Sequence, residues 1–220
     1  MRKFFVTATG TDLGKTYVLC DLVRQLRERG QTVSCLKPVL SGFDAMALED
    51  SDSGRLLAAM GKAIDLKQIS EISPWLFRAP LSPDMAAKRE GKSVKFAEVK
   101  RFCESAPGSS LDVFFVEGAG GVMSPLGDGF TNLDLICALN YRVILVAGGY
   151  LGTISHTLTA CEALSRRHCR VDAIVLSEPQ TGPVSIFETR DTISKFTDVP
   201  IHCMEKDARA PGALVDLIAS

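Results

Sequence analysis

The sequence lacks a long apolar run, a strong charge of either sign and a metal-binding cysteine pattern. No run of about 18 apolar residues could span a bilayer, and the apolar part of the opening MRKFFVTATG is too short for a signal peptide. The formal net charge is −1, so no broad basic surface favours nucleic acid or an anionic membrane. We therefore expect a cytoplasmic protein that contacts neither nucleic acid nor membrane.

The cysteines are odd in number and scattered along the chain. There is no C-x-x-C pair and no cluster of cysteine with histidine, which argues against a zinc site and a disulfide framework. We expect most of them to be buried thiols in a reducing compartment. The seven positions are Cys20, Cys35, Cys103, Cys137, Cys161, Cys169 and Cys203.

Short apolar runs alternate with helical segments along the 220 residues, of which 46% are hydrophobic. Strands rich in Val, Ile and Phe that lack alternation are typical of a sheet covered on both faces. The predicted strands are 3–8, 32–37, 111–118, 142–149 and 171–177, with a weaker one at 199–204. The predicted helices are 15–29, 52–60, 93–104, 132–139, 153–168, 184–196 and a short C-terminal segment.

This alternation predicts an α/β fold with a mostly parallel sheet and helices on both faces. The length and hydrophobic content fit one domain spanning residues 1–220. Residues 62–92 show little regular pattern, and connections of that length are usually functional or carry small helices.

A phosphate-binding loop is predicted where the first strand meets the first helix, which indicates a P-loop NTPase-like fold. In FFVTATGTDLGKTYVLC, Lys15 can reach the β- and γ-phosphates and Thr16 can place its hydroxyl on Mg²⁺. In the usual spacing the first glycine would fall on Thr9. The preceding Ala8 would be strained if that position needed a positive φ. The alternative is an ordinary glycine-containing turn before a helix.

Three charged residues follow strand ends or open a helix. Lys37, in LKPVLSG with Ser41, would lie beside the phosphate loop and could neutralise charge during phosphoryl transfer. A surface lysine before a turn is the equal alternative. Glu117 precedes GAGG and is favoured as a Mg²⁺ ligand. Asp52 opens a helix, and the pattern alone favours it as the N-cap.

The segment LGTISH at 151–156 also opens a helix after a strand. Gly152, Thr153 and Ser155 could bind an anion such as a carboxylate at the helix N-terminus. Ordinary capping is the alternative. His156 and the two other histidines are isolated in the sequence, and no catalytic role is assigned to them.

Together these motifs resemble the dethiobiotin synthetase family. ATGTDLGKT (8–16) matches the family's longer loop without gaps, with Ala8 at the place of its first glycine. The motifs KPVLSG (37–42), SD (51–52), SPWLFRAPLSP (73–83), VEGAGG (116–121) and LGTISH (151–156) also match in order and spacing. The resemblance covers nearly the whole chain through about residue 177.

The resemblance implies an ATP-dependent cyclo-ligase. Such an enzyme takes 7,8-diaminononanoate and CO₂ or bicarbonate and closes a cyclic urea, giving dethiobiotin, ADP and phosphate in biotin biosynthesis. A carbamate formed on one amine attacks the γ-phosphate, and the second amine then closes the ring and expels phosphate. The expected cofactors are ATP and Mg²⁺. The family is a homodimer with the substrate at the interface.

The resemblance also implies roles for individual residues. Lys37, Lys15, Thr11 and Ser41 are the expected catalytic residues, with Thr11 and Ser41 holding the carbamate. Thr16, Asp52 and Glu117 are expected to hold Mg²⁺, which reverses the preference for a cap at Asp52. The expected nucleotide contacts are Asp12, Leu13, Gly14, Lys15, Thr16, Tyr17, Asp52, Glu117, Gly118, Ala119, Gly120 and Ser177. The expected substrate contacts are Thr11, Lys37, Ser41, Gly152, Thr153, Ile154 and Ser155, the last four binding the carboxylate of a substrate held by the partner subunit.

Some positions depart from the family pattern. Ala8 replaces a glycine, Asp12 stands where glutamate is frequent and Ser155 where asparagine is common. In VLSEPQ (175–180), Ser177 replaces an asparagine that reads adenine. A serine hydroxyl cannot donate and accept along one base edge as an amide does, so our hypothesis is weak base selectivity. The segment 199–211 matches poorly.

Two other functions use the same kind of loop. A dimeric ATPase switch of the partitioning or positioning type carries a second lysine early in the loop, where Gly10 stands here. A small-molecule kinase usually has an arginine-rich lid, whereas residues 120–150 contain only Arg142. The motif set therefore favours the ligase.

Overall fold

The computed structural model describes residues 1–105, 110–178 and 184–220. Its centre is a six-stranded sheet in the order β10-β9-β8-β1-β5-β2, and all five neighbouring pairs are parallel. The strands are β1 Arg2–Ala8, β2 Val33–Leu36, β5 Val113–Glu117, β8 Arg142–Gly148, β9 Val171–Ser177 and β10 Ile201–Met204. These are the six strands predicted from the apolar runs, so the parallel α/β fold is confirmed.

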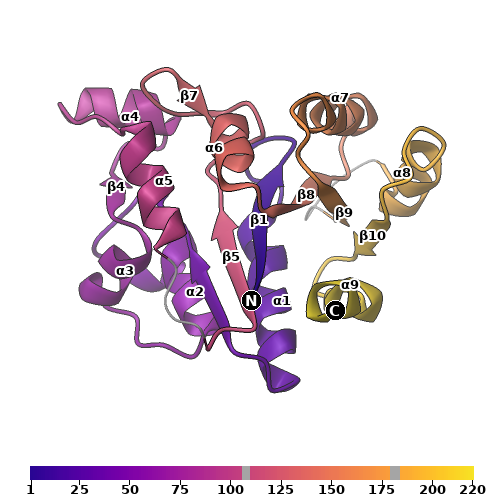
Figure 1. Ribbon diagram of the computed structural model, residues 1–220, viewed down its shortest axis with the longest axis horizontal. Helices are drawn as coiled ribbons and strands as arrows, with labels where there is room; N and C mark the ends of the chain where they lie inside the picture. Colours follow the sequence, from indigo (N-terminus) through magenta and orange to yellow (C-terminus); the bar gives the residue numbers. More distant parts are fainter. Residues whose placement is uncertain (106–109, 179–183) are drawn as a thin grey trace.

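Helices cover both faces of this sheet, as Figure 1 shows. Right-handed crossovers put α1 on one face and α6 and α7 on the other. Helix α1 packs against α2 and α9, α5 against α6, and α7 against α8. The helices that match predictions are α1 Lys15–Glu28, α2 Asp52–Ala59, α5 Phe96–Glu104, α6 Asn132–Leu139, α7 Thr153–Arg166, α8 Ile186–Ile193 and α9 Gly212–Ala219.

The region of little pattern contains short elements. Residues 62–92 hold α3 Leu66–Ile72, β4 Trp75–Phe77 and α4 Pro83–Arg89, in agreement with the expectation of small helices there. Strand β4 pairs in parallel with β3 Val39–Ser41, which directly follows Lys37 and Pro38. A second pair, β6 Pro125–Gly127 and β7 Phe130–Thr131, is antiparallel, and a 3₁₀ turn, η1 Leu48–Asp50, precedes α2. The short strands β3, β4, β6 and β7 and the turn η1 were not predicted.

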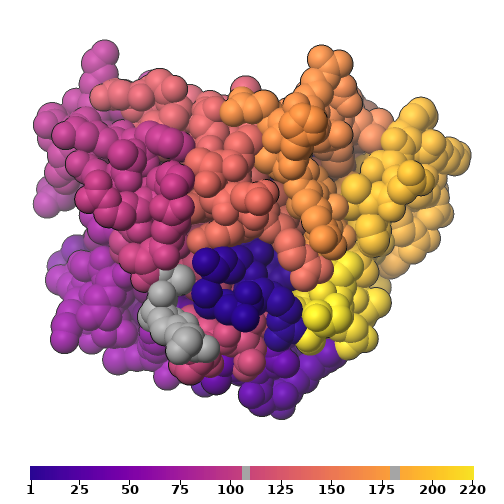
Figure 2. All heavy atoms as spheres, in the orientation of Figure 1, coloured from indigo at the N-terminus to yellow at the C-terminus, as the bar shows by residue number. Residues whose placement is uncertain are grey.

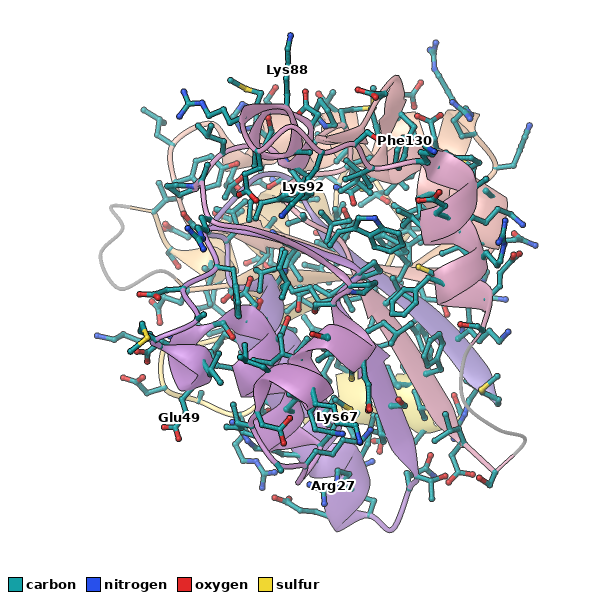
Figure 3. The ribbon with its side chains drawn as sticks, turned by 90° about the vertical axis from the view of Figure 1, so that its left-hand side faces the viewer. Arg27, Glu49, Lys67, Lys88, Lys92 and Phe130 are labelled. Atoms are coloured by element: carbon teal, nitrogen blue, oxygen red, sulfur yellow. The ribbon has the colours of Figure 1, made fainter. Side chains whose placement is uncertain are left out.

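The core lies in the central strands. Every residue of β5 is buried, and Phe4 and Phe5 of β1 are fully buried. In Figure 2 the first residues of the chain, in indigo, lie beside the C-terminal segment in yellow. Figure 3 shows Lys88 of α4 pointing away from the body of the molecule, whereas Phe130 points inward. No helix within the described ranges is long and apolar enough to cross a bilayer.

Because the strands are parallel, the carboxyl ends of β1, β5, β8 and β9 lie side by side along the same edge of the sheet. The loops that leave these strands, at 9–14, 118–121 and 149–152, therefore gather at this edge. Open α/β sheets bind ligands at the carboxyl ends of their strands. All the sequence motifs for chemistry lie on these loops or on the elements beside them.

Candidate active site

The phosphate loop joins the end of β1 to the start of α1. Gly14 is left-handed, with φ 86°, and Asp12 is also left-handed, with φ 56°. Ala8 is not among the residues with positive φ, because it is the last residue of β1 and is fully buried. The strain considered for Ala8 is therefore not present. The unusual backbone falls instead on Asp12, a residue type that tolerates this conformation better than most.

Lys15 and Thr16, at the start of α1, both point into the site. The Nζ atom of Lys15 donates to the carbonyl oxygen of Gly10 at 3.3 Å. Burial and the nearby Lys37 ammonium lower the pKa of Lys15. The hydroxyl of Thr16 donates to Glu117 Oε1 at 2.7 Å. The loop, the first turn of α1 and the end of β5 are thus joined directly.

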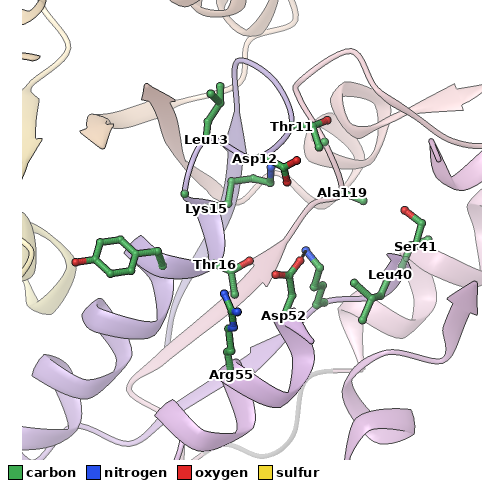
Figure 4. A pocket seen from close by; sticks show the side chains of 15 residues that line it. Thr11, Asp12, Leu13, Lys15, Thr16, Leu40, Ser41, Asp52, Arg55 and Ala119 are labelled. Carbon is green, nitrogen blue, oxygen red and sulfur yellow. Dashed lines mark ion pairs between the residues drawn. The ribbon is translucent and has the colours of Figure 1, made fainter. Parts of the chain in front are cut away.

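Lys37 is not a surface lysine, because only 3% of its side chain is exposed. Its Nζ lies 2.7 Å from Glu117 Oε1 and 3.0 Å from Asp52 Oδ2. Burial alone would lower the pKa of Lys37, but the Glu117 and Asp52 carboxylates outweigh it and raise the pKa. Figure 4 shows the Asp52 carboxylate, one of the two partners of this lysine, beside Thr16. The ammonium is therefore a fixed positive charge between two carboxylates.

Asp52 is not the N-cap of α2, so the interpretation from pattern alone was wrong. Ser51 is the cap, and its side chain accepts from the N–H of Gly54 at 3.0 Å. A Cβ on Gly54 would lie 2.0 Å from the Leu48 carbonyl oxygen, so α2 starts directly against the preceding 3₁₀ turn. This packing leaves Asp52 free to reach Lys37. Burial would raise the pKa of Asp52, but Lys37 and Thr16 lower it.

Glu117 ends β5 and is fully buried. Its Oε1 accepts from Thr16 and Lys37, whereas its Oε2 is buried without a hydrogen-bond partner among the described residues. A buried carboxylate oxygen without a partner is costly unless a ligand satisfies it. No group of three or more His, Cys, Asp or Glu side chains suited to a metal occurs in the described ranges. Any ion held here would rely on two carboxylates, a hydroxyl and other oxygens.

Asn132 holds the GAGG loop, and the sequence analysis missed it. Its Nδ2 donates to the carbonyl oxygens of Ala119 and Gly121, both at 2.7 Å. The residue is fully buried at the first position of α6, which begins with a capping box between Thr131 and Asp134. The T-x-x-D pattern at 131–134 announces the helix start. Nothing in the sequence shows that the enclosed asparagine reaches back to the loop.

Two cavities meet at this edge of the sheet, each with a volume of about 340 Å³. The first contains the phosphate loop, Lys37 and Asp52, and the second extends between the loop and residues 80–83. They share the wall formed by Thr11, Asp12, Ser41, Ala119 and Gly120. Two different molecules bound in these cavities would therefore lie next to each other.

Other residues line the two cavities without having been predicted. Arg55 stands one turn after Asp52, and in Figure 4 its guanidinium group points toward Thr16. Within the described ranges, no carboxylate forms an ion pair with it. The second cavity adds Pro80, Leu81, Ser82, Pro83 and Ser124. Arg55 carries no motif signal, because a charged residue on the exposed face of a helix is ordinary.

The start of α7 differs from the phosphate loop. Gly152 is left-handed with φ 99°, and no side chain caps the helix, so ordinary side-chain capping is absent at this described end. Thr153 is 1% exposed, and its hydroxyl has no partner among the described residues. Ile154 is half-buried and Ser155 is exposed. None of the residues 152–155 lines either cavity.

Tyr150 joins this helix start to the phosphate loop. Its hydroxyl lies 2.9 Å from His156 Nδ1 and 3.4 Å from the Thr9 hydroxyl. Sequence reasoning gave no role to Tyr150 and none to His156. The contact depends on a chain reversal between residues 148 and 152, which no local pattern reveals. Tyr150 thus links the start of α7 to the phosphate loop through its hydroxyl.

The predicted nucleotide contacts beyond the loop lie in different settings. Ser177 ends β9 and is 6% exposed, and a Cβ on Gly14 would lie 2.7 Å from its Oγ. Leu13 and Tyr17 line the first cavity, and the Tyr17 hydroxyl donates to the Ala208 carbonyl oxygen at 3.1 Å. The segment 175–180 is described only as far as Glu178, so Pro179 and Gln180 lie outside the described residues.

Comparisons with known proteins agree with one another. A family model described as an AAA domain matches residues 2–204. A protein of a Caulobacter species named ATP-dependent dethiobiotin synthetase BioD is 47% identical, over 98% of this chain and 94% of its own length. A protein of the same name from Methylobacterium nodulans is 38% identical, over 99% of each chain.

Solved structures of lower identity show the same fold. The MinC:MinD cell division protein complex of Aquifex aeolicus matches with a TM-score of 0.55 at 13% identity, covering 100% of this chain and 86% of that one. The signal recognition particle receptor FtsY from Elizabethkingia anophelis gives 0.52 at 16% identity, covering 100% of this chain and 65% of that one. At such identities the likeness concerns the fold alone.

Proposed function

This chain belongs to the ATP-dependent dethiobiotin synthetase family and is an ATP-dependent ligase, and on that premise we propose its substrates and the roles of its residues. The substrates are 7,8-diaminononanoate and CO₂, taken up from bicarbonate. The products are dethiobiotin, ADP and phosphate. Residues 1–220 act as one P-loop domain, and the enzyme works in the cytoplasm, a reducing compartment in which free thiols are the resting form.

The two adjoining cavities carry this proposal. Closing a urea ring with ATP requires that a carbamate and a γ-phosphate meet, so the two binding sites must share a wall. Thr11 and Ser41 belong to that wall, and Lys15 and Lys37 line the nucleotide side of it. A binding module would need only one of the cavities.

The residues at the wall would stabilise negative oxygens at every stage. Thr11 and Ser41 hold the carbamate that forms when one substrate amine takes up CO₂. Lys15 and Lys37 neutralise the charge that builds up as a carbamate oxygen attacks the γ-phosphate in line. They remain in place while the second amine attacks the carbonyl carbon of the resulting anhydride and phosphate leaves. Preorganised cations at such positions are the largest catalytic contribution expected of a protein here.

The oxygen ligands fit a Mg²⁺ ion, because the Thr16 hydroxyl and the Asp52 and Glu117 carboxylates come together and Glu117 Oε2 is buried without a partner. We propose that Thr16, Asp52 and Glu117 hold the ion. When bound, Mg²⁺ would offset phosphate charge and orient the polyphosphate. Lys37 would then bind the reacting oxygens in place of the two carboxylates that it now bridges.

The nucleotide is bound by backbone and side-chain groups along the first cavity. The proposed contacts are Asp12, Leu13, Gly14, Lys15, Thr16, Tyr17, Asp52, Glu117, Gly118, Ala119, Gly120 and Ser177. Ser177 ends β9 beside Gly14, and its hydroxyl cannot donate and accept along one base edge as an amide does. Comparison of turnover with ATP, CTP and GTP tests the hypothesis of weak base selectivity, and a strong preference for ATP would refute it.

We also propose a homodimer in which Gly152, Thr153, Ile154 and Ser155 bind the carboxylate of a substrate held by the other protomer. These residues lie outside both cavities of their own chain. Leu151 is 88% exposed and Met123 is 60% exposed, and both lie on loops at the carboxyl edge of the sheet. We propose that the second protomer covers these two side chains.

The experiment uses purified protein, 7,8-diaminononanoate, labelled bicarbonate, Mg²⁺ and ATP. Free carbamates lose CO₂ in acid, whereas a cyclic urea keeps it. Acid-stable label that requires both nucleotide and diamine supports the proposed substrates. ATP hydrolysis that proceeds equally without the diamine, with no acid-stable label, contradicts them.

A further inference from the structure

Two thiols from different elements lie against each other outside the active site. Cys137 is on α6, and Cys169 stands between α7 and β9, 32 residues later in the chain. Their Sγ atoms are 3.1 Å apart. A disulfide bond has a length of about 2.05 Å, so an approach of about 1 Å would bring the two sulfurs to bonding distance.

Hydrogen bonds hold both thiols in this arrangement. Each sulfur faces the Arg167 carbonyl oxygen, at 3.9 Å for Cys137 and 3.7 Å for Cys169. The N–H of Cys169 donates to the Leu164 carbonyl oxygen at 3.0 Å. The preceding His168 is left-handed, with φ 56°, and turns the chain from α7 toward β9. The backbone around Cys169 therefore fixes the position of its sulfur beside that of Cys137.

Small molecules in solution can reach this pair. Both side chains are only half-buried, and Cys137 borders a surface depression of about 560 Å³ whose lining includes Phe130, Asp134 and Arg167. Cys20, Cys35 and Cys103 are buried instead. Cys161 and Cys203 are half-buried, but in the described part of the chain neither has a second sulfur within hydrogen-bond reach.

We propose that Cys137 and Cys169 are a redox modification site. Small-molecule disulfides such as oxidised glutathione oxidise the pair, and a reversible disulfide bond forms between the two cysteines. The Cys137 thiolate attacks the reagent disulfide, giving a mixed disulfide and releasing one thiol. The Cys169 thiolate then attacks the Cys137 sulfur and releases the second thiol. Two S–H bonds are lost and one S–S bond forms, while the reagent takes up two electrons and two protons. This inference is independent of the proposed substrates.

The acid–base properties of the pair predict how its rate changes with pH. Burial and the hydrogen bond with Cys137 raise the pKa of Cys169 to about 12. The hydrogen bond with the Cys137 thiol is lost in the mixed disulfide, but burial still raises the pKa of Cys169 there, so the attacking thiolate is scarce near neutral pH and the second step accelerates as the solution becomes alkaline. The expected rate of disulfide closure therefore rises between pH 7 and pH 9, by roughly tenfold per pH unit at most.

The test incubates the folded, full-length protein with oxidised glutathione and then counts free thiols after denaturation. The expected count falls from seven to five, with a mass loss of about 2 Da and a peptide map that links residues 137 and 169. Dithiothreitol restores seven thiols. The oxidised protein should also show a higher midpoint of thermal unfolding, because the bond closes a loop in the unfolded chain.

Matched variants complete the test. Cys161→Ser should still form the bond, whereas Cys169→Ser should stop at the mixed glutathione adduct and show no rise in the unfolding midpoint. A count that stays at seven in the wild-type protein at pH 9 would overturn the proposal. A bond that maps to other cysteines, or one that links two chains on a non-reducing gel, would overturn it equally.

Discussion

The two ends of the candidate site are built differently. At the phosphate-loop end, the buried Lys37 and Glu117 form a directly bonded cluster with Thr16 and with the half-buried Asp52. At the start of α7, Leu151 and Ser155 are exposed, and no side chain caps the helix. The first end has its charges fixed by contacts within the chain, as the proposed phosphate chemistry requires. At the second end the buried Thr153 hydroxyl has no partner among the described residues, which fits the carboxylate site that we propose there.

The strongest test of this contrast removes the central cation. Lys37→Gln should lower kcat by at least about 100-fold, because a preorganised charge at the reacting oxygens is lost. The free energy of unfolding should also fall by about 3–5 kcal/mol, since Glu117 keeps a buried carboxylate without its partner. Steady-state kinetics and urea unfolding measure the two effects.

The control for this substitution is Lys88→Gln, which removes an exposed lysine of α4 that points away from the body of the molecule. It should leave both quantities unchanged. A folded Lys37→Gln protein, verified by circular dichroism, that keeps more than about a tenth of wild-type turnover would remove Lys37 from the mechanism.

The next test loosens the GAGG loop without touching a charge. Asn132→Leu removes the two hydrogen bonds to Ala119 and Gly121. Leaving these carbonyl oxygens without their donor should cost about 1–3 kcal/mol of stability and raise the KM for ATP. Asn140→Gly is the control on the same helix, because Asn140 is left-handed with φ 52° and glycine adopts that conformation readily. Equal KM values for ATP in the two variants would show that Asn132 does not position the loop for the nucleotide.

A smaller effect is expected at the rim of the phosphate-loop end. Arg55→Ala should weaken binding of ATP and ADP by about fivefold, or about 1 kcal/mol, because Arg55 lines the proposed nucleotide cavity but solvent screens its exposed guanidinium. Arg24→Ala removes an exposed arginine of α1 that does not line the cavity. Isothermal titration should show a clearly weaker Kd for ATP in Arg55→Ala than in Arg24→Ala. Equal Kd values in the two variants would show that Arg55 does not contribute to nucleotide binding.

The contact between the two ends of the site can be removed by deleting one oxygen atom, the hydroxyl of Tyr150. Tyr150→Phe removes the hydroxyl that contacts Thr9 and His156. A net loss of about 0.5–1.5 kcal/mol is typical of such a bond, and we expect it as a rise of a few-fold in the KM for the diamine. The Kd for ATP should stay within twofold of the wild-type value. A larger change in the Kd for ATP would place Tyr150 with the phosphate-loop end instead.

The smallest expected effect is on the pH dependence of stability, which should reflect the ion pairs between Lys37, Asp52 and Glu117. The pKa of Asp52 is lowered from its usual 3.8, so its contribution is present above that pH and is lost as pH falls through the lowered value. The pKa of Lys37 is raised from 10.5, so its contribution is present below that pH and is lost as pH rises through the raised value. Asp52→Asn should flatten the acid limb of urea-unfolding free energies, and Asp198→Asn, on an exposed residue, should not. Identical acid limbs for Asp52→Asn and wild type would contradict the pairing.

The same contrast explains what the sequence could predict. Buried strands and helix periods are local signals, so all six strands of the sheet and the helices around it were predicted correctly. Strands β3 and β4 have three residues each, which is too short for a pattern. The sequence could bring Lys15, Thr16, Lys37 and Glu117 together at the phosphate-loop end because they lie in contiguous motifs at strand ends and at a helix start.

Residues whose roles depend on chain reversal were missed. Asn132 reaches back to Ala119 and Gly121, and Tyr150 reaches across to Thr9. At Asp52 the pattern for a helix start was correct but one residue off, because Ser51 carries the cap. Local patterns locate elements, whereas contacts between separated segments need the fold itself.

The wall shared by the two cavities determines which positions can be varied to engineer this chain toward other substrates. A substitution at Thr11, Asp12 or Ser41 alters both cavities at once, so a library built on them selects against the nucleotide as well. Residues 80–83 and Ser124 line only the second cavity. Variation confined to those positions offers a route to diamines of other chain lengths while the nucleotide side keeps its native composition.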